Sequence, residues 1–400
     1  MAQIDKQTEA RDTTSIAERF VIVGAGIAAV AAAQEIRKLH PAASIVMIGE
    51  ENVLPYDHDA FYRHLLLPGA GEIFSLRPPE WYSVHGIFLL SGRRVMRLLP
   101  RVKELELSDG TVLHYDKCIL ATGSAPILPD LEGNTLRGVF AVGKLNMDER
   151  EHLARYLRPD MRAVVVGGGA SALMLAKQLY LGGCHVTVLA EGDRLLGGQV
   201  STRVSDEIVR LAAQMGIEIR TSVHVTRLRG EDRVEQVILP GEYLNAEAVL
   251  FCVGSRPRIS LAQEAGLDTD GGITVNSRMM TGKYGIYACG DCVSATGEVW
   301  DSARIAARMG RYAGRNAAGE DAMYRPSVPL LRMDAFGVSL IAVGTCADGE
   351  GIREEHRVSE RGEVFLYRDG GRLCGAVILG DVEDAEELVR ELVCGANVLE

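Results

Sequence analysis

The chain has 400 residues, of which 47% are hydrophobic and 24% charged, and its formal net charge is −11. That length suits two or three domains, and the composition is typical of a globular protein rather than a disordered one. The negative charge argues against a nucleic-acid partner, since phosphates would be repelled. No apolar run approaches the ~20 residues that a membrane-spanning helix needs, so we expect no membrane partner either.

The polar segment 1–18 has no apolar core of signal-peptide length, and we expect it to be a flexible extension. Eight cysteines are scattered along the chain, several of them inside apolar runs. Such usage favours buried reduced thiols over a disulfide framework. We therefore predict a cytoplasmic protein.

The first informative unit is a predicted strand at 20–23, a glycine turn with the pattern G-x-G-x-x-A, an alanine-rich helix to about residue 39 and a strand at 44–48. In a dinucleotide-binding βαβ unit the first glycine permits the tight turn, and the second lets the backbone approach a pyrophosphate. The helix N-terminus attracts phosphate, and an acid after the second strand accepts hydrogen bonds from the ribose hydroxyls. The residues predicted to contact the nucleotide are Gly24, Ala25, Gly26, Ala28, Ala29 and Glu50.

By itself, this unit also fits a close-packed turn without a ligand. A strand within 115–126 enters a turn at Ala121, Thr122 and Gly123, and a strand within 282–294 ends at Gly290 and Asp291, before an expected helix. An aspartate at such a strand end can accept hydrogen bonds from sugar or ribityl hydroxyls. Each turn alone is ordinary, but their order after the first unit favours a flavin nucleotide.

A second copy of the glycine pattern lies between those two turns. The strand predicted at 163–166 leads into Gly167, Gly169 and Ala172, and a helix and a strand at 185–190 complete the unit. Two such units indicate two dinucleotides and electron transfer between them. The alternative is that the second unit has become scaffold.

Together these residues resemble the FAD-dependent pyridine nucleotide–disulfide oxidoreductase superfamily. Within it, the chain looks most like the branch of NADH:rubredoxin reductases and of the NADH-oxidising part of assimilatory nitrite reductases. The likeness to the superfamily is carried by both glycine patterns, Glu50, "ATG", "VGSRP" and "GD", and it covers about residues 19–325 in the family's order. The likeness to the branch is carried by "WYSVHGIFLL", "LSDGTVLHYDKCILATGSAP" and the C-terminal "GRLCGAVILGDVEDAEELV".

The resemblance implies an α/β fold with two Rossmann-like domains and a small α+β C-terminal domain. The FAD domain, at 19–138 and 255–325, would be interrupted by an NAD(P) domain at 139–254. Residues 326–400 would form a C-terminal interface domain, through which relatives often contact another subunit or a partner.

The resemblance also implies the cofactors FAD and NAD(H), with hydride passing from the nicotinamide to flavin N5. NADP is the less favoured nucleotide, because no basic cluster follows the second unit. FAD would be held by the first glycine turn with Ala121, Thr122, Gly123, Gly290, Asp291 and Trp300, although Trp300 also suits packing between domains. NAD would be held by Gly167, Gly169, Ala170, Ser171, Ala172, Glu191, Val253 and Gly254.

Several positions depart from the branch. After a retained Pro-Tyr, His58 replaces an arginine, and Arg63 stands where a lysine near the flavin is common. His58 and Arg63 are therefore candidate catalytic groups, the alternative being a solvated polar loop. Met174 lies where relatives often carry a glutamate facing the nicotinamide. Ala190 lies where they carry the ribose acid, which here comes one residue late.

The cysteines carry no redox or metal pattern. Disulfide reductases of the superfamily need two cysteines close to the flavin, whereas the only C-x-x-C here, Cys289 to Cys292, encloses the Gly-Asp pair. Both thiols are expected to be buried packing residues. A single C-x-x-C without nearby histidines is also insufficient for zinc, so no metal site is predicted.

The remaining elements are a strand at 243–253, strands at 338–343, 364–367 and 373–379, and an acidic helix at 385–394. No catalytic set is found among the last three strands and the helix.

We therefore predict an FAD-dependent NAD(P)H:acceptor oxidoreductase without a redox disulfide. It would reduce a small redox protein, rubredoxin or ferredoxin, or an iron–sulfur partner subunit. One alternative is an FAD-containing electron-transfer subunit with a weak nicotinamide site, working in either direction. The other is a non-catalytic, FAD-stabilised interaction module. A homo- or hetero-oligomer through the C-terminal domain is compatible with all three interpretations.

Overall fold

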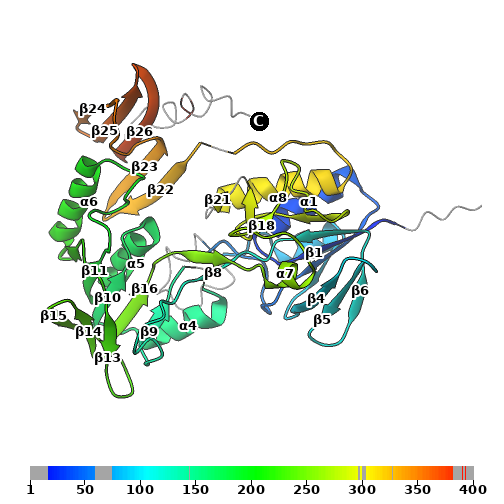
Figure 1. Ribbon diagram of the computed structural model, residues 1–400, viewed down its shortest axis with the longest axis horizontal. Helices are drawn as coiled ribbons and strands as arrows, with labels where there is room; N and C mark the ends of the chain where they lie inside the picture. Colours follow the sequence, from blue (N-terminus) through cyan, green and yellow to red (C-terminus); the bar gives the residue numbers. More distant parts are fainter. Residues whose placement is uncertain are drawn as a thin grey trace, which may run out of the picture.

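The computed structural model describes residues 17–58, 74–143, 145–295, 298–299, 303–326 and 328–381, with residues 390 and 392. Within these ranges the chain forms two five-stranded parallel sheets and one five-stranded antiparallel sheet, which we call the first, second and C-terminal sheets (Figure 1). The predicted fold class is confirmed. Among the helices described, none has the length and apolar character required to cross a bilayer.

The first sheet has the strand order β19-β7-β1-β2-β3. Its strands are β19 (Ile286–Ala288), β7 (Lys117–Leu120), β1 (Arg19–Val23), β2 (Ser44–Ile48) and β3 (Ile87–Leu90). The predicted first unit is confirmed, because α1 (Ile27–Leu39) joins β1 to β2. The strands are short apolar runs, and those in the middle of the sheet are almost wholly buried, as parallel strands in α/β proteins are. The edge strand β3 is less buried, and its Phe88 is 65% exposed.

Helix α8 (Ala303–Ala317) packs on α1 through small residues. A β-carbon at Gly310 would overlap the carbonyl oxygen of Ala28, and one at Gly314 would overlap that of Ala32. Glycine is required at both places because the two helix backbones approach so closely. This contact places the first turn of α8 beside the start of α1.

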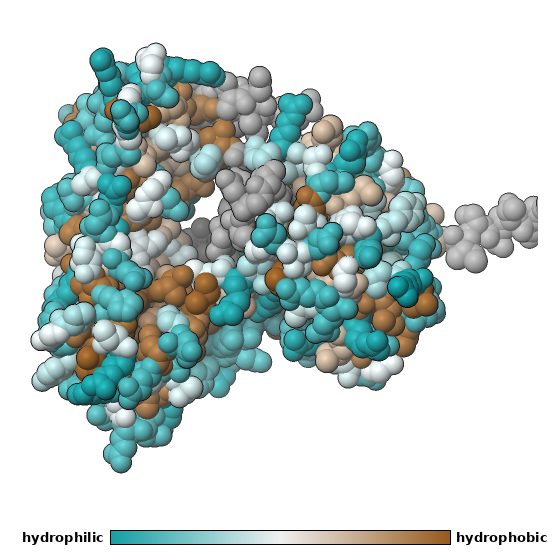
Figure 2. All heavy atoms as spheres, in the orientation of Figure 1, coloured by the Kyte–Doolittle hydropathy of each residue, from teal (hydrophilic) through white to brown (hydrophobic). Residues whose placement is uncertain are grey.

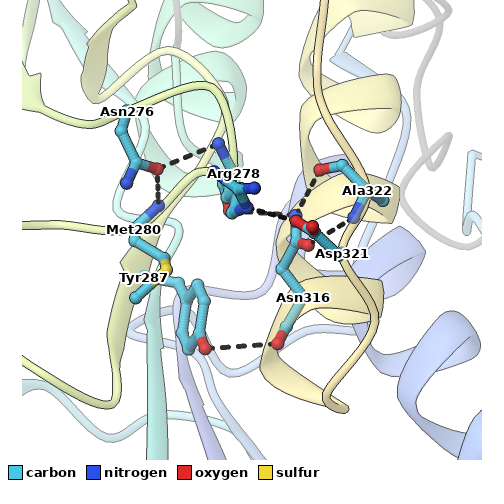
Figure 3. A network of polar contacts seen from close by, with 7 residues as sticks. All are labelled: Asn276, Arg278, Met280, Tyr287, Asn316, Asp321 and Ala322. Carbon is cyan, nitrogen blue, oxygen red and sulfur yellow. Dashed lines mark hydrogen bonds and ion pairs between the residues drawn. The ribbon is translucent and has the colours of Figure 1, made fainter.

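Asn316 fixes the other end of α8 to the first sheet (Figure 3). Its buried side-chain amide donates to the carbonyl oxygens of Arg278, at 3.0 Å, and Ala322, at 2.8 Å. Its oxygen accepts the Ala322 N–H at 2.8 Å. The Asn316 carbonyl accepts the hydroxyl of Tyr287 at 3.2 Å, and Arg278 pairs with Asp321. The segment that leads toward the C-terminal sheet is thereby anchored where it leaves α8.

The second sheet has the strand order β12-β11-β10-β16-β9. Its strands are β12 (Glu218–Arg220), β11 (His185–Leu189), β10 (Arg162–Val166), β16 (Ala248–Phe251) and β9 (Val139–Ala141). Its helices are α4 (Met147–Tyr156), α5 (Ala170–Leu181) and α6 (Thr202–Met215). The predicted strand–helix–strand unit from 163 to 190 is confirmed by β10, α5 and β11.

The prediction of one continuous strand at 243–253 is wrong. The chain forms β15 (Glu242–Asn245), which pairs in a small antiparallel sheet with β14 (Gln236–Leu239) and β13 (Arg227–Arg229), and then β16. The break falls at residues 246–247, where the chain leaves an exposed strand and enters a buried one.

Two adjacent strands connect the two parallel sheets. They are β8 (Ser124–Pro126) and β17 (Ser255–Pro257), which pair antiparallel. Small elements flank the first sheet: α3 (Pro79–Val84), α7 (Ser260–Glu264), β4 (Val95–Leu99), β5 (Glu104–Leu107), β6 (Val112–His114), β18 (Ile273–Thr274), β20 (Val293–Ala295) and β21 (Glu298–Val299). The helix expected after Gly290 and Asp291 is α8, which begins only at Ala303 because β20 and β21 come first.

The C-terminal sheet has the strand order β22-β23-β26-β25-β24 and covers α6 and α5 (Figure 1). Its strands are β22 (Leu330–Ala335), β23 (Val338–Gly344), β24 (Ile352–Ser359), β25 (Gly362–Asp369) and β26 (Arg372–Gly380). The three predicted strands are β23, β25 and β26, whereas β22 and β24 were not predicted. The helix predicted at 385–394 lies outside the described residues except for 390 and 392. Figure 2 shows an opening between this side of the molecule and the side that carries the first sheet.

Candidate cofactor site

The first glycine turn joins β1 to α1 and crosses the end of β7. Gly24 has φ +116°, and a β-carbon there would overlap the carbonyl oxygen of Ala121, so only glycine fits. Gly26 is the N-cap of α1, and a β-carbon there would have no neighbour within 4 Å. The turn is therefore closed on the side of β7 and open at the N-terminus of α1, which is the geometry that a pyrophosphate requires.

A cavity of about 740 Å³ begins at this turn. That volume lies in the range of small-molecule and cofactor sites. Its wall includes the predicted residues Gly24, Ala25, Gly26, Ala28, Glu50 and His58, with the segments 121–123 and 290–291. Ala29 is instead fully buried beneath α1, where it packs the helix on the sheet. Arg63 and Trp300 lie outside the described residues.

Two consecutive glutamates follow β2 and line the cavity. The side chain of Glu50 is 62% exposed, and its carboxylate lies 3.7 Å from Nη1 of Arg94. Glu51, which sequence reasoning missed, accepts the backbone N–H of Met147 at 2.9 Å and the hydroxyl of Tyr56 at 3.2 Å. Burial raises the pKa of Glu51, although both hydrogen bonds lower it. Its position between the predicted ribose acid and the Pro-Tyr pair was the available signal.

Arg258 is a second residue that sequence reasoning missed. It lines the cavity together with Arg94, and its backbone bridges the turn at 122–123. Its N–H donates to the carbonyl of Gly123 at 2.9 Å, and its carbonyl accepts the hydroxyl of Thr122 at 2.8 Å. The two guanidinium groups supply positive charge suited to a diphosphate ligand. The only sequence signal was a basic residue after "GSRP".

His58 lies at the wall of the cavity, next to a buried tyrosine. Its ring centroid is 4.5 Å from that of Tyr56. The structure thus brings His58 to the same cavity as the first glycine turn. Its role as a catalytic group stays a prediction.

Cys289 and Cys292 flank the Gly-Asp pair and are both fully buried. The Cys292 thiol donates to the Cys289 carbonyl at 3.3 Å, and burial raises the pKa of both thiols. Protonated, buried thiols are poor nucleophiles, so these side chains serve as packing residues. The cysteines in the described ranges are free thiols, and no cluster of metal-ligating side chains is found there.

The second glycine turn repeats the construction of the first. Gly167 has φ +142°, and a β-carbon there would overlap the carbonyl oxygen of Cys252 at the end of β16. Gly169 is the N-cap of α5, and a β-carbon there would again have no neighbour within 4 Å. Ala170 and Ser171 form the first turn of α5, and Ala172 is fully buried against the sheet.

The segment after β11, where the acid that contacts the ribose was expected, differs from its counterpart after β2. The Ala190 side chain is only 1% exposed, and its β-carbon lies 3.0 Å from where a β-carbon on Gly168 would be. The Glu191 side chain is 80% exposed and its carboxylate lies 3.0 Å from Nδ1 of His224. The one-residue delay therefore puts a methyl group against the turn and directs the acid away from it. Met174, at the position where a glutamate was expected, is partly buried and packs against the hydrophobic core.

The predicted residues Val253 and Gly254 lie just after β16, where the chain starts back toward the first sheet. Val253 is partly exposed, Gly254 has φ +101°, and the Gly254 carbonyl accepts the Ile127 N–H at 3.1 Å.

The family model described as pyridine nucleotide-disulphide oxidoreductase matches residues 18–310. The chain belongs to this family. The ferredoxin–NAD(+) reductase subunit of a benzene 1,2-dioxygenase system from Pseudomonas putida is 31% identical over 277 residues, covering 69% of this chain and 67% of that protein. Putidaredoxin reductase from Pseudomonas putida is 32% identical over 297 residues, covering 71% of this chain and 69% of that protein.

A crystal structure of a covalent putidaredoxin reductase–putidaredoxin complex has a TM-score of 0.84 and 26% identity, covering 94% of this chain and 93% of that one. The comparisons confirm the family and the fold class predicted from the sequence. They also confirm, at the level of the family, an oxidoreductase that uses FAD and NAD(H).

Proposed function

We propose that the protein oxidises NADH with FAD as its prosthetic group and delivers the electrons to a small iron–sulfur or rubredoxin-like protein. One observation carries this proposal: two glycine turns of the same construction, at Gly24–Gly26 and Gly167–Gly169, each leave open space at a helix N-terminus. FAD supplies the chemistry that couples a two-electron hydride donor to one-electron carriers.

The residues around the cavity fit FAD. The N-terminus of α1 and the open side of Gly26 suit its pyrophosphate, with positive charge from Arg258 nearby. Glu50 suits the ribose hydroxyls and Asp291 those of the ribityl chain. Ala303, the first residue of α8, also lines the cavity, so the positive end of that helix dipole would stabilise negative charge on FAD bound there.

A basic helix face beside the cavity suits an acidic carrier protein. Arg304 and Arg311 are exposed on α8, about two turns apart, in a chain whose formal net charge is −11. Local positive charge of this kind attracts and orients an acidic partner even when the whole protein is negative. The relatives named above include a ferredoxin reductase and a putidaredoxin reductase, which supports a carrier of this class. We place the reaction in the cytoplasm.

A second candidate is an FAD-containing electron-transfer subunit in which the nicotinamide site is weak. The burial of Ala190 where relatives carry an acid, and the outward direction of Glu191, favour it. This arrangement removes one hydrogen-bond acceptor from the ribose end while leaving the phosphate turn intact.

Anaerobic titration of the purified yellow protein with NADH and NADPH separates the two candidates. Bleaching of the flavin band within seconds by NADH supports the proposed reaction. Bleaching by dithionite alone, followed by reoxidation with NAD+, supports the second candidate. A colourless protein that takes up no FAD when it is added would contradict both.

A further inference from the structure

The connection between β11 and α6, residues 190–201, packs directly on the second glycine turn. The Leu196 N–H donates to the carbonyl of Gly168, the middle glycine, at 2.8 Å. A β-carbon on Gly168 would lie 3.7 Å from Leu195 and 3.8 Å from the Arg194 carbonyl oxygen. The Leu195 N–H is held in turn by the Ser205 hydroxyl at 3.0 Å. The shape of the turn therefore depends on where residues 194–196 are held.

A carboxylate from the C-terminal sheet holds this connection. Asp348, between β23 and β24, accepts Nη1 of Arg194 at 3.0 Å, the N–H of Thr202 at 2.8 Å and the Thr202 hydroxyl at 2.6 Å. Arg194 also donates to the Thr202 hydroxyl at 2.6 Å. The Thr202 hydrogen bonds and then the charge of Arg194 hold the pKa of Asp348 below its usual range.

Asp348 also caps the N-terminus of α6, although it lies far from that helix in the sequence. The N-cap Ser201 makes no side-chain cap hydrogen bond, because its hydroxyl lies 3.0 Å from the Tyr367 hydroxyl on β25. The first N–H of α6 is satisfied by Asp348 instead. An acid at a helix N-terminus both accepts the unpaired N–H groups and interacts favourably with the helix dipole. The first turn of α6 is thus completed by a residue 146 positions away.

We propose that Asp348 is a positioning residue for the nicotinamide nucleotide: it holds Arg194 and the start of α6, and so keeps residues 194–196 against Gly168. The inference rests on the proposed use of NADH at the second glycine turn. It assigns the C-terminal sheet a role within its own chain, in addition to the interface with another subunit expected from the sequence. Loss of the carboxylate loosens the nucleotide end of the site and leaves the cavity beside the first sheet unchanged.

The test compares Asp348→Ala with Asp334→Ala in the full-length holoprotein. Asp334 on β22 pairs with Lys177 of α5 at 2.6 Å, so it too joins the C-terminal sheet to the second sheet, but away from residues 194–196. Loss of one cap and one ion pair should weaken NAD+ binding in Asp348→Ala about 5- to 10-fold by calorimetry, and raise the KM for NADH similarly. The FAD content and kcat should stay at wild-type values.

Two readouts do not depend on turnover: NAD+ binding and hydrogen exchange of the Leu196 amide, which should accelerate in Asp348→Ala only. Asp348→Asn keeps an acceptor for Thr202 and should restore part of the affinity; it also carries the test if the alanine variant does not fold. Unchanged NAD+ affinity in Asp348→Ala, or an equal loss in Asp334→Ala, would overturn the proposal. A wild type that binds NAD+ but is not reduced by NADH would refute the proposed reaction alone.

Discussion

Gly169→Ala should separate nucleotide binding from folding. Gly169 has φ −88° and open space around the position of a β-carbon, so the folded protein accepts the methyl group. The same methyl group occupies the space through which a pyrophosphate approaches the N–H groups of α5. A hydrogen bond to a charged group contributes about 1.5–3 kcal/mol, and about 1.4 kcal/mol corresponds to a tenfold change in affinity. Loss of one such bond therefore predicts roughly 10- to 100-fold weaker NADH binding.

The assay is stopped-flow reduction of the flavin over a range of NADH concentrations. Gly169→Ala should shift the half-saturating concentration, with unchanged FAD content and Tm. Gly26→Ala, the matched change in the first turn, should instead lose FAD. Gly167→Ala should lower Tm, because its methyl group overlaps the Cys252 carbonyl oxygen. Wild-type half-saturation in Gly169→Ala would show that NADH does not bind at this turn.

Glu51→Gln should remove part of the pH dependence of stability. The pKa of Glu51 in the folded state lies above its ordinary value of 4.5, so the folded state binds a proton more readily than the unfolded state. The free energy of unfolding of the wild type should therefore rise relative to the variant as pH falls through that pKa toward 4.5. Parallel curves of unfolding free energy against pH, from urea titrations, would contradict this. Gly310→Ala should lower Tm in calorimetry, because overlap with the Ala28 carbonyl costs about 1–3 kcal/mol and outweighs the ~1 kcal/mol that alanine gains in a helix; an unchanged Tm would argue against the close contact. Replacing Arg304 and Arg311 together by glutamate should raise the KM for an acidic ferredoxin and flatten its salt dependence, with the ferricyanide reductase rate as control. An unaltered salt response would place the carrier elsewhere.

The parts of the fold that could be predicted are those with local signals. The strands β1 and β2 and helix α1 are apolar runs bounded by glycine, and the structure places them within a residue or two of the predicted ranges. Strand β24 could not be predicted, because its sequence IREEHRVS is mostly charged and exposed. It is stabilised by pairing with β25 and by the stacking of His356 on Phe365, with ring centroids 4.4 Å apart. The pairing and the ring stacking both depend on β25, which follows β24 in the sequence.

The candidate site divides in the same way. The glycine turns are contiguous patterns, so Gly24, Gly26, Gly167 and Gly169 could be found from spacing alone. Arg258 reaches the same cavity from more than two hundred residues farther along the chain, and only the pairing of β8 with β17 brings it there. This pairing leaves no local pattern in the sequence, so Arg258 could not be assigned to the cavity from the sequence.

The pairing of β8 with β17 also bears on how such a protein can be built and rebuilt. Where the second sheet and its helices enter and leave the chain, the two connections are hydrogen-bonded neighbours, with Ser124 opposite Pro257 and Pro126 opposite Ser255. Because the two junctions of this inserted unit lie side by side, the unit can be exchanged for another of different nucleotide preference by joining both ends at the β8–β17 pair. The β8–β17 pair is also the two-stranded connection between the first and second sheets. Bending at this pair would change the distance between the two nucleotide sites.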